Sequence, residues 1–138
     1  MDISVLDGSS YFKGLLLLIR KDNKISKYEH ELIARVGKTL GFEKKFIENA
    51  VKEIIRNKYI TPDPPEFSNR ELAEKFLKDG LTLAASDREI HPHELAWLTA
   101  VAEKNSIGRA WLLKEKKNMA GIEKHSVQLE ADDLKVIF

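Results

Sequence analysis

The chain has 138 residues, of which 43% are hydrophobic and 33% charged, with a net charge of +1 and no cysteine. This length suits one domain that buries a core without disulfides or metal, and the near-neutral charge argues against nucleic-acid binding. The absence of cysteine excludes disulfides, thiolate catalysis and cysteine-ligated metal sites. The longest apolar run, Leu15 to Ile19, is too short to cross a bilayer, and the first residues lack a signal-peptide pattern. We therefore expect a cytoplasmic protein.

Three helices are predicted in the first half of the chain. Residues 11–20 are apolar nearly all round, which is typical of a central buried helix, and residues 9–10 are two serines that fit its cap. A second helix follows Ser26, whose spacing to Glu29 is that of a capping box, and it ends at Gly41. A third helix has its apolar residues on one face: Phe46, Ile47, Ala50, Val51, Ile54 and Ile55.

A proline-rich linker over residues 59–67 separates these helices from three more. The fourth helix is predicted to begin at a second capping box, formed by Ser68 and Glu71. Pro92 suits the first position of the fifth helix, and a shorter sixth helix follows it. The tail over residues 122–138 fits a short helix and an extended strand equally well.

An internal repeat is the strongest signal, because the chain overlays on itself when it is shifted by 65 residues. Matched positions are mostly apolar, and Trp97 and Trp111, as counterparts of Leu32 and Phe46, are predicted to lie in the core. We expect one all-α domain, a helical bundle of two pseudo-symmetric three-helix halves. Its parts are the domain 1–138, the repeats 11–58 and 68–117, the linker 59–67 and a C-terminal extension 118–138.

Both repeats contain the turn D-x-x-I-x-x-x-E. It resembles the second half of an EF-hand loop, but Leu18 and Leu83 stand where that loop has its first ligand, which excludes an ordinary EF-hand. Two interpretations of the four acids stay open. They cap the turns and helix starts, or pseudo-symmetry brings them together around a hard divalent cation. These acids are Asp22, Glu29, Asp87 and Glu94.

The second turn also contains two histidines, His91 and His93, where the first has Ser26 and Tyr28. Histidines beside carboxylates are ligands for zinc or nickel. Because they are two residues apart at a helix start, we expect the two side chains to point in different directions. A solvated surface role is therefore favoured over a metal-binding role.

The duplicated turn, placed between an apolar helix and a helix ending near G-F or S-I, is similar to that of the TerB-like family, named for tellurite resistance. The resemblance covers about residues 10–115. It implies a bundle of two related helical halves and a cytoplasmic bacterial protein of stress responses, active near the membrane. It also implies metal binding through Asp22, Glu29, Asp87 and Glu94. The chain departs from the family where the usual D-G is replaced by Asp22-Asn23 and Asp87-Arg88.

Three functions follow from these patterns. The first is a non-catalytic, stress-related module that binds a divalent metal ion, and the second is a metal-free protein-interaction scaffold. The third, ranked below them, is a metal-dependent hydrolase with Glu94 as base and a histidine as ligand. The expected partner is another protein, without a transmembrane segment in this chain and with association at a membrane surface left open. The residues alone favour the scaffold, and the family resemblance raises the metal module to the same level.

Overall fold

A computed structural model describes residues 1–20, 25–87, 90–119 and 128–138, except for the side chain of Asp87. The prediction of an all-α bundle is confirmed, since helices make up most of this part of the chain. None of the described helices is long and apolar enough to cross a membrane. The elements are β1 (Asp2–Ser4), α1 (Val5–Arg20), α2 (Lys27–Thr39), α3 (Lys44–Arg56), α4 (Arg70–Ala84), η1 (Ala85–Asp87), α5 (Pro92–Lys104), α6 (Arg109–Asn118), η3 (Glu130–Asp133) and β2 (Lys135–Ile137).

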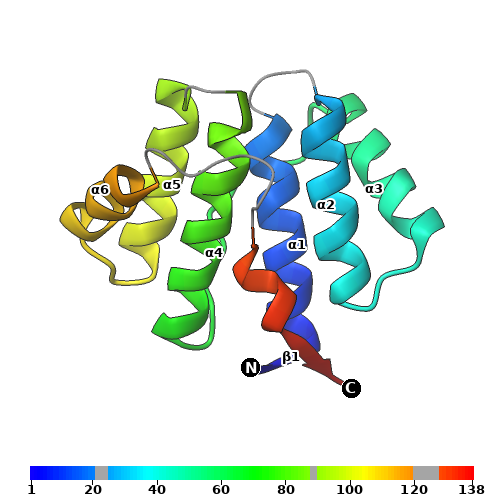
Figure 1. Ribbon diagram of the computed structural model, residues 1–138. Coiled ribbons are helices and arrows are strands. Elements are labelled where there is room, and N and C mark those ends of the chain that lie inside the picture. The colour runs from blue at the N-terminus through cyan, green and yellow to red at the C-terminus, as the bar shows by residue number, and fades with distance from the viewer. Residues whose placement is uncertain (21–24, 88–89, 120–127) are drawn as a thin grey trace.

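Helices α1 and α4 form the centre of the bundle, with α2 and α3 beside α1 and with α5 and α6 beside α4 (Figure 1). The two central helices run in the same direction. The ends of α1 and α4 and the starts of α2 and α5 therefore lie at one end of the bundle, and both chain termini lie at the other. This arrangement brings the starts of α2 and α5, which carry Glu29 and Glu94, to the same end.

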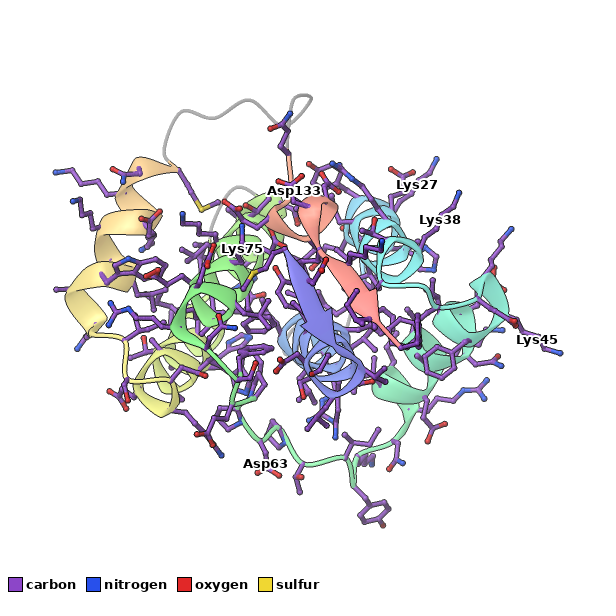
Figure 2. All side chains as sticks on the ribbon, turned by 90° about the horizontal axis from the view of Figure 1, so that it is seen from below. Lys27, Lys38, Lys45, Asp63, Lys75 and Asp133 are labelled. Atoms are coloured by element: carbon purple, nitrogen blue, oxygen red, sulfur yellow. The ribbon has the colours of Figure 1, made fainter. Side chains whose placement is uncertain are left out.

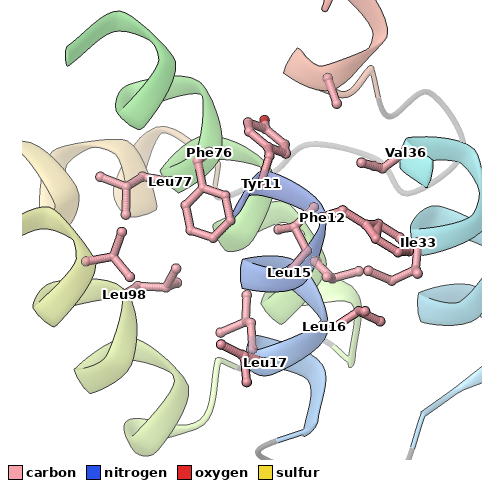
Figure 3. Packing of buried hydrophobic residues seen from close by; sticks show 14 of the residues in the cluster. Tyr11, Phe12, Leu15, Leu16, Leu17, Ile33, Val36, Phe76, Leu77 and Leu98 are labelled. Atoms are coloured by element: carbon pink, nitrogen blue, oxygen red, sulfur yellow. The ribbon is translucent and has the colours of Figure 1, made fainter. Parts of the chain in front are cut away.

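The core is built around α1, as its all-round apolar sequence predicts. Its side chains pack on one side against Phe76 and Leu77 of α4 and on the other against Ile33 and Val36 of α2 (Figure 3). Gly14 of α1 permits this packing, because a Cβ atom there would lie 2.7 Å from the Phe76 ring. The α1 residues that are at most 5% exposed include Tyr11, Phe12, Leu15, Leu16, Leu17, Leu18 and Ile19.

Two predicted helix starts are wrong. The first helix begins six residues earlier than predicted, and the serines at 9–10 lie inside it, because the hydroxyl of Ser4 accepts a hydrogen bond from the Asp7 N–H at 3.0 Å. Helix α4 is capped by Asn69, whose side chain accepts from the Leu72 N–H at 2.9 Å. Ser68 instead donates its hydroxyl hydrogen bond to the buried carboxylate of Asp7.

The tail contains both of the alternatives that its sequence allows. Residues Glu130–Asp133 form the 3₁₀ helix η3, and β2 then pairs in parallel with β1, with Ile3 opposite Val136. Figure 2 shows these two strands side by side beneath α1. Arg35 of α2 pairs with Asp132 of η3, which holds the tail against the first half. Strand β1 could not be predicted, since three residues are too few to show a strand pattern.

The linker packs closely against the second half. The indole N–H of Trp97 donates to the Pro62 carbonyl at 2.9 Å, and Asn105 donates to the Pro65 carbonyl at 2.9 Å. The prediction that Trp97 belongs to the core is confirmed, because it is 6% exposed, whereas Trp111 is only half-buried.

Candidate functional site

Glu29 and Glu94 occupy equivalent places in the first turns of α2 and α5. The Glu29 carboxylate accepts from the Ser26 N–H at 3.1 Å, and the Ser26 hydroxyl accepts from the Glu29 N–H at 3.1 Å. The Glu94 carboxylate likewise accepts from the His91 N–H at 3.1 Å. Both acids are almost fully buried, at 2% and 1% exposure. The structure therefore shows each of them capping its own helix, as the structural interpretation predicts.

His91 and His93 do not diverge, so that part of the sequence prediction is wrong. Their rings are stacked, with centroids 5.3 Å apart and planes inclined by 14°. The reason is that His91 precedes the helix in an extended conformation (φ −63°, ψ 145°), which turns its side chain back toward that of His93. Both histidines are exposed, whereas Glu94 is buried.

The predicted metal site is described only in part. Asp22 lies outside the described residues, as does the side chain of Asp87. Among the side chains that are described, no three histidine, aspartate or glutamate residues are grouped so that they could hold a metal ion. Metal binding through Asp22, Glu29, Asp87, Glu94, His91 and His93 stays a prediction.

Two apolar surface grooves flank α3. The α1–α3 groove has a volume of about 320 Å³, and the α2–α3 groove has a volume of about 410 Å³. Phe42, in the loop between α2 and α3, lines both of them. The α1–α3 groove is otherwise lined mainly by Phe12, Leu16, Phe46, Ala50 and Ile54, and the α2–α3 groove by His30, Ala34, Lys38, Lys44, Ile47 and Glu48.

Aromatic rings form the boundary between these grooves. The rings of Phe42 and Phe46 are stacked with centroids 5.1 Å apart, and Phe12 lies 5.0 Å from Phe42. Phe46 is 52% exposed, although it belongs to the apolar stripe of α3. The apolar face of α3 is therefore wider than the part of it that α1 and α2 cover. In the second repeat, Ile107 stands in the place of Phe42 and is only 2% exposed.

A buried polar cluster, which sequence reasoning missed, links α1, α4 and η3. The Tyr11 hydroxyl donates to the Asp79 carboxylate at 2.5 Å, and the N–H groups of Glu130 and Ala131 donate to it at 2.7 and 2.9 Å. Burial raises the pKa of Asp79 from 3.8 to about 6, even though these three hydrogen bonds lower it. Burial, together with the Asp79 charge, raises the pKa of Tyr11 well above 10.0.

A signal for this cluster was present in the sequence. Asp79 lies three residues after Phe76 and four before Leu83, so it falls on the buried stripe of its helix. A carboxylate on such a stripe requires buried hydrogen-bond donors. Both oxygens of the Asp79 carboxylate accept hydrogen bonds from Tyr11 or from η3. The cluster therefore holds the tail against the helices, and its geometry is that of a structural contact rather than of a catalytic site.

No protein-family model, curated protein or solved structure matches this chain. The similarity to the TerB-like family stays a prediction that is based on the two turns.

Proposed function

We propose that this chain is a non-catalytic interaction domain that binds a partner protein over the surface of α3. The observation that supports this most directly is the pair of apolar grooves that meet at Phe42. Exposed apolar area of this kind is favourable to remove from water, and half-buried aromatic side chains are the usual anchors of protein interfaces. Phe46, stacked on Phe42 and half-exposed, is such an anchor.

The environment of Glu94 also supports a binding role over a catalytic one. Glu94, which a hydrolase would need as its base, is buried and accepts a hydrogen bond from the backbone of His91. The two histidines that would be the ligands of a metal, His91 and His93, are exposed instead. A metal-binding role in stress responses, by contrast, depends on Asp22 and Asp87 and is tested separately below.

The proposal is tested by selecting peptides of about 16 residues that bind the full chain from a randomised library and then measuring their affinities by fluorescence anisotropy. We expect selected peptides to lose affinity about tenfold or more with Phe46→Ala, because an anchor side chain is removed. Leu113→Ala is the matched control, since Leu113 is also exposed (41%) but lies on α6. Equal losses for the two variants, or none, would count against the α3 surface.

A further inference from the structure

The α2 wall of the α2–α3 groove is basic. Lys27, His30, Ala34 and Lys38 are spaced by three, four and four residues, which places them on one face of the helix. The last three line the groove. Lys27 and Lys38 extend from the same side of α2 in Figure 2, which looks along this helix. All three basic residues are exposed, and so is Glu31, which lies four residues after Lys27 and three before Ala34 on the same face of the helix but does not line the groove.

The opposite wall adds Lys44 and one acid, Glu48, while Phe42 and Ile47 supply the apolar floor. Neither Lys38 nor Lys44 forms an ion pair with another side chain in the described part of the chain. Arg35, on a different face of α2, pairs with Asp132, which shows that the nearby acid of the tail is already engaged. The groove is thus apolar at its floor, and its two lysines, Lys38 and Lys44, outnumber its one acid, Glu48, so that the lining has a net positive charge.

We infer that the α2–α3 groove binds an acidic amphipathic helix of a partner protein. This inference rests on the proposed function and adds the chemistry of the partner. Apolar side chains at positions i, i+3, i+4 and i+7 of that helix would lie on Phe42, Ala34 and Ile47, as in other helix-in-groove complexes. Acidic residues at its flanks would meet Lys38 on one wall and Lys44 on the other. Helix α2 has 13 residues and is about 20 Å long, which matches three to four turns of a partner helix.

Other anionic partners fit the groove less well. A nucleic acid requires several closely spaced cations along a backbone, whereas Glu48 interrupts the basic residues here. A membrane surface is attracted by clusters of four or more basic residues on one helix, and α2 presents two lysines and a histidine on this face. A helix with alternating apolar and acidic residues uses both the floor and the walls.

The probe is a synthetic 16-residue helical peptide with leucines at i, i+3, i+4 and i+7 and glutamates on both flanks of the leucine stripe. Two matched peptides have glutamine or lysine in place of every glutamate. Affinities are measured by anisotropy with the full chain, and the site is located by NMR shifts of α2 and α3. We expect the glutamate peptide to bind at least about fivefold more tightly than the glutamine peptide, and its binding to weaken as salt rises.

Charge reversal of the walls gives the sharper test. With Lys38→Glu combined with Lys44→Glu, we expect the glutamate peptide to lose affinity about tenfold and the lysine peptide to gain it. The control is Lys116→Glu combined with Lys117→Glu on α6, which makes the same change of net charge away from the groove. Circular dichroism checks that both variants are folded. If a variant does not fold, the salt dependence measured with the unaltered chain still tests the inference.

Three outcomes would overturn the inference. If the three peptides bind equally in the groove, the proposal of an interaction domain is kept, and the inference that its partner is acidic is refuted. If no peptide shifts α2 or α3 and the library also yields no binder, the proposed function fails as well. If oleate or vesicles containing anionic lipid shift these helices while the glutamate peptide does not, the groove binds a lipid instead.

Discussion

The hydroxyl of Tyr11 in α1 donates a hydrogen bond of 2.5 Å to the carboxylate of Asp79 in α4, in the interior of the protein. These residues are 68 positions apart and belong to different halves of the chain. The same carboxylate accepts the first two N–H groups of η3, so a single aspartate joins the central helices to the C-terminal tail. Its contribution to stability can be measured through each partner separately.

Removing the phenol hydroxyl isolates the link between the two helices. In Tyr11→Phe the ring remains, while the buried carboxylate loses one of its three donors. We expect the free energy of unfolding to fall by about 1–3 kcal/mol, because a buried charged acceptor is left incompletely satisfied. Urea unfolding at pH 7 measures this. Tyr59→Phe is the control, since Tyr59 is 92% exposed, and a similar loss there would refute the role of the Asp79 hydrogen bond.

The raised pKa of Asp79 makes stability depend on pH in a defined direction. With a pKa of about 6 in the folded chain and 3.8 as its ordinary value, the carboxyl holds its proton more tightly when the chain is folded. Its contribution to stability is therefore fully present below about pH 4 and is lost as the pH rises through about 6. The full change corresponds to about 3 kcal/mol.

We expect the stability of the unaltered chain, measured relative to Asp79→Asn, to fall between pH 4 and pH 7. Urea unfolding of both proteins at intervals of half a pH unit gives this difference. A difference that is constant with pH would show that the three donors balance the effect of burial on the pKa, and one that rises toward pH 7 would show that they outweigh it.

Gly37 sets how closely α2 approaches its neighbours. A Cβ atom there would lie 2.7 Å from Ile47 and 3.1 Å from Phe12, both of which are buried. We expect Gly37→Ala to lower the free energy of unfolding by about 1–2 kcal/mol, since overpacking exceeds the gain in helix propensity. Gly108→Ala is the control, because a Cβ atom there meets nothing within 4 Å. Thermal unfolding compares the two, and a more stable Gly37→Ala would mean that α3 shifts freely.

Metal binding by the paired turns is tested with Glu29→Gln combined with Glu94→Gln. Glutamine can still accept the backbone hydrogen bonds of the capping boxes, so the fold is kept while two charges are removed. If the four acids bind a cation, calorimetric titration of the chelator-treated chain with Ca²⁺, Mg²⁺, Mn²⁺ and Zn²⁺ gives saturable heat that this variant loses. The absence of heat from the unaltered chain would leave Glu29 and Glu94 as helix caps alone.

Local signals in the sequence were sufficient to predict a helix end where the residues that cap the helix are close to it in the chain. The capping box of Ser26 and Glu29 is observed as predicted, and Gly41 ends α2 with a φ of 92°, a conformation that few other residues adopt. At α4 the same pattern misled, because Ser68 is engaged by Asp7, which lies 61 residues away, and Asn69 caps the helix instead.

The candidate sites depended on contacts that no local pattern contains. The stacked imidazoles of His91 and His93 follow from the extended backbone before α5. Helical spacing placed Phe46 on the apolar face of α3, but it could not show that this face is only partly covered. The partners of Asp79 are more than 50 residues away in both directions, so only the folded chain brings them together.

The parallel pairing of β1 with β2 has a mechanical consequence. Asp2 lies opposite Lys135 and Ser4 opposite Ile137, so the chain enters at one end of the strand pair and leaves at the other. A force that pulls Met1 and Phe138 apart therefore slides the strands along each other, and their hydrogen bonds must break together instead of one at a time. The strand pair thus acts as a clamp that carries tension before any of it reaches the helices.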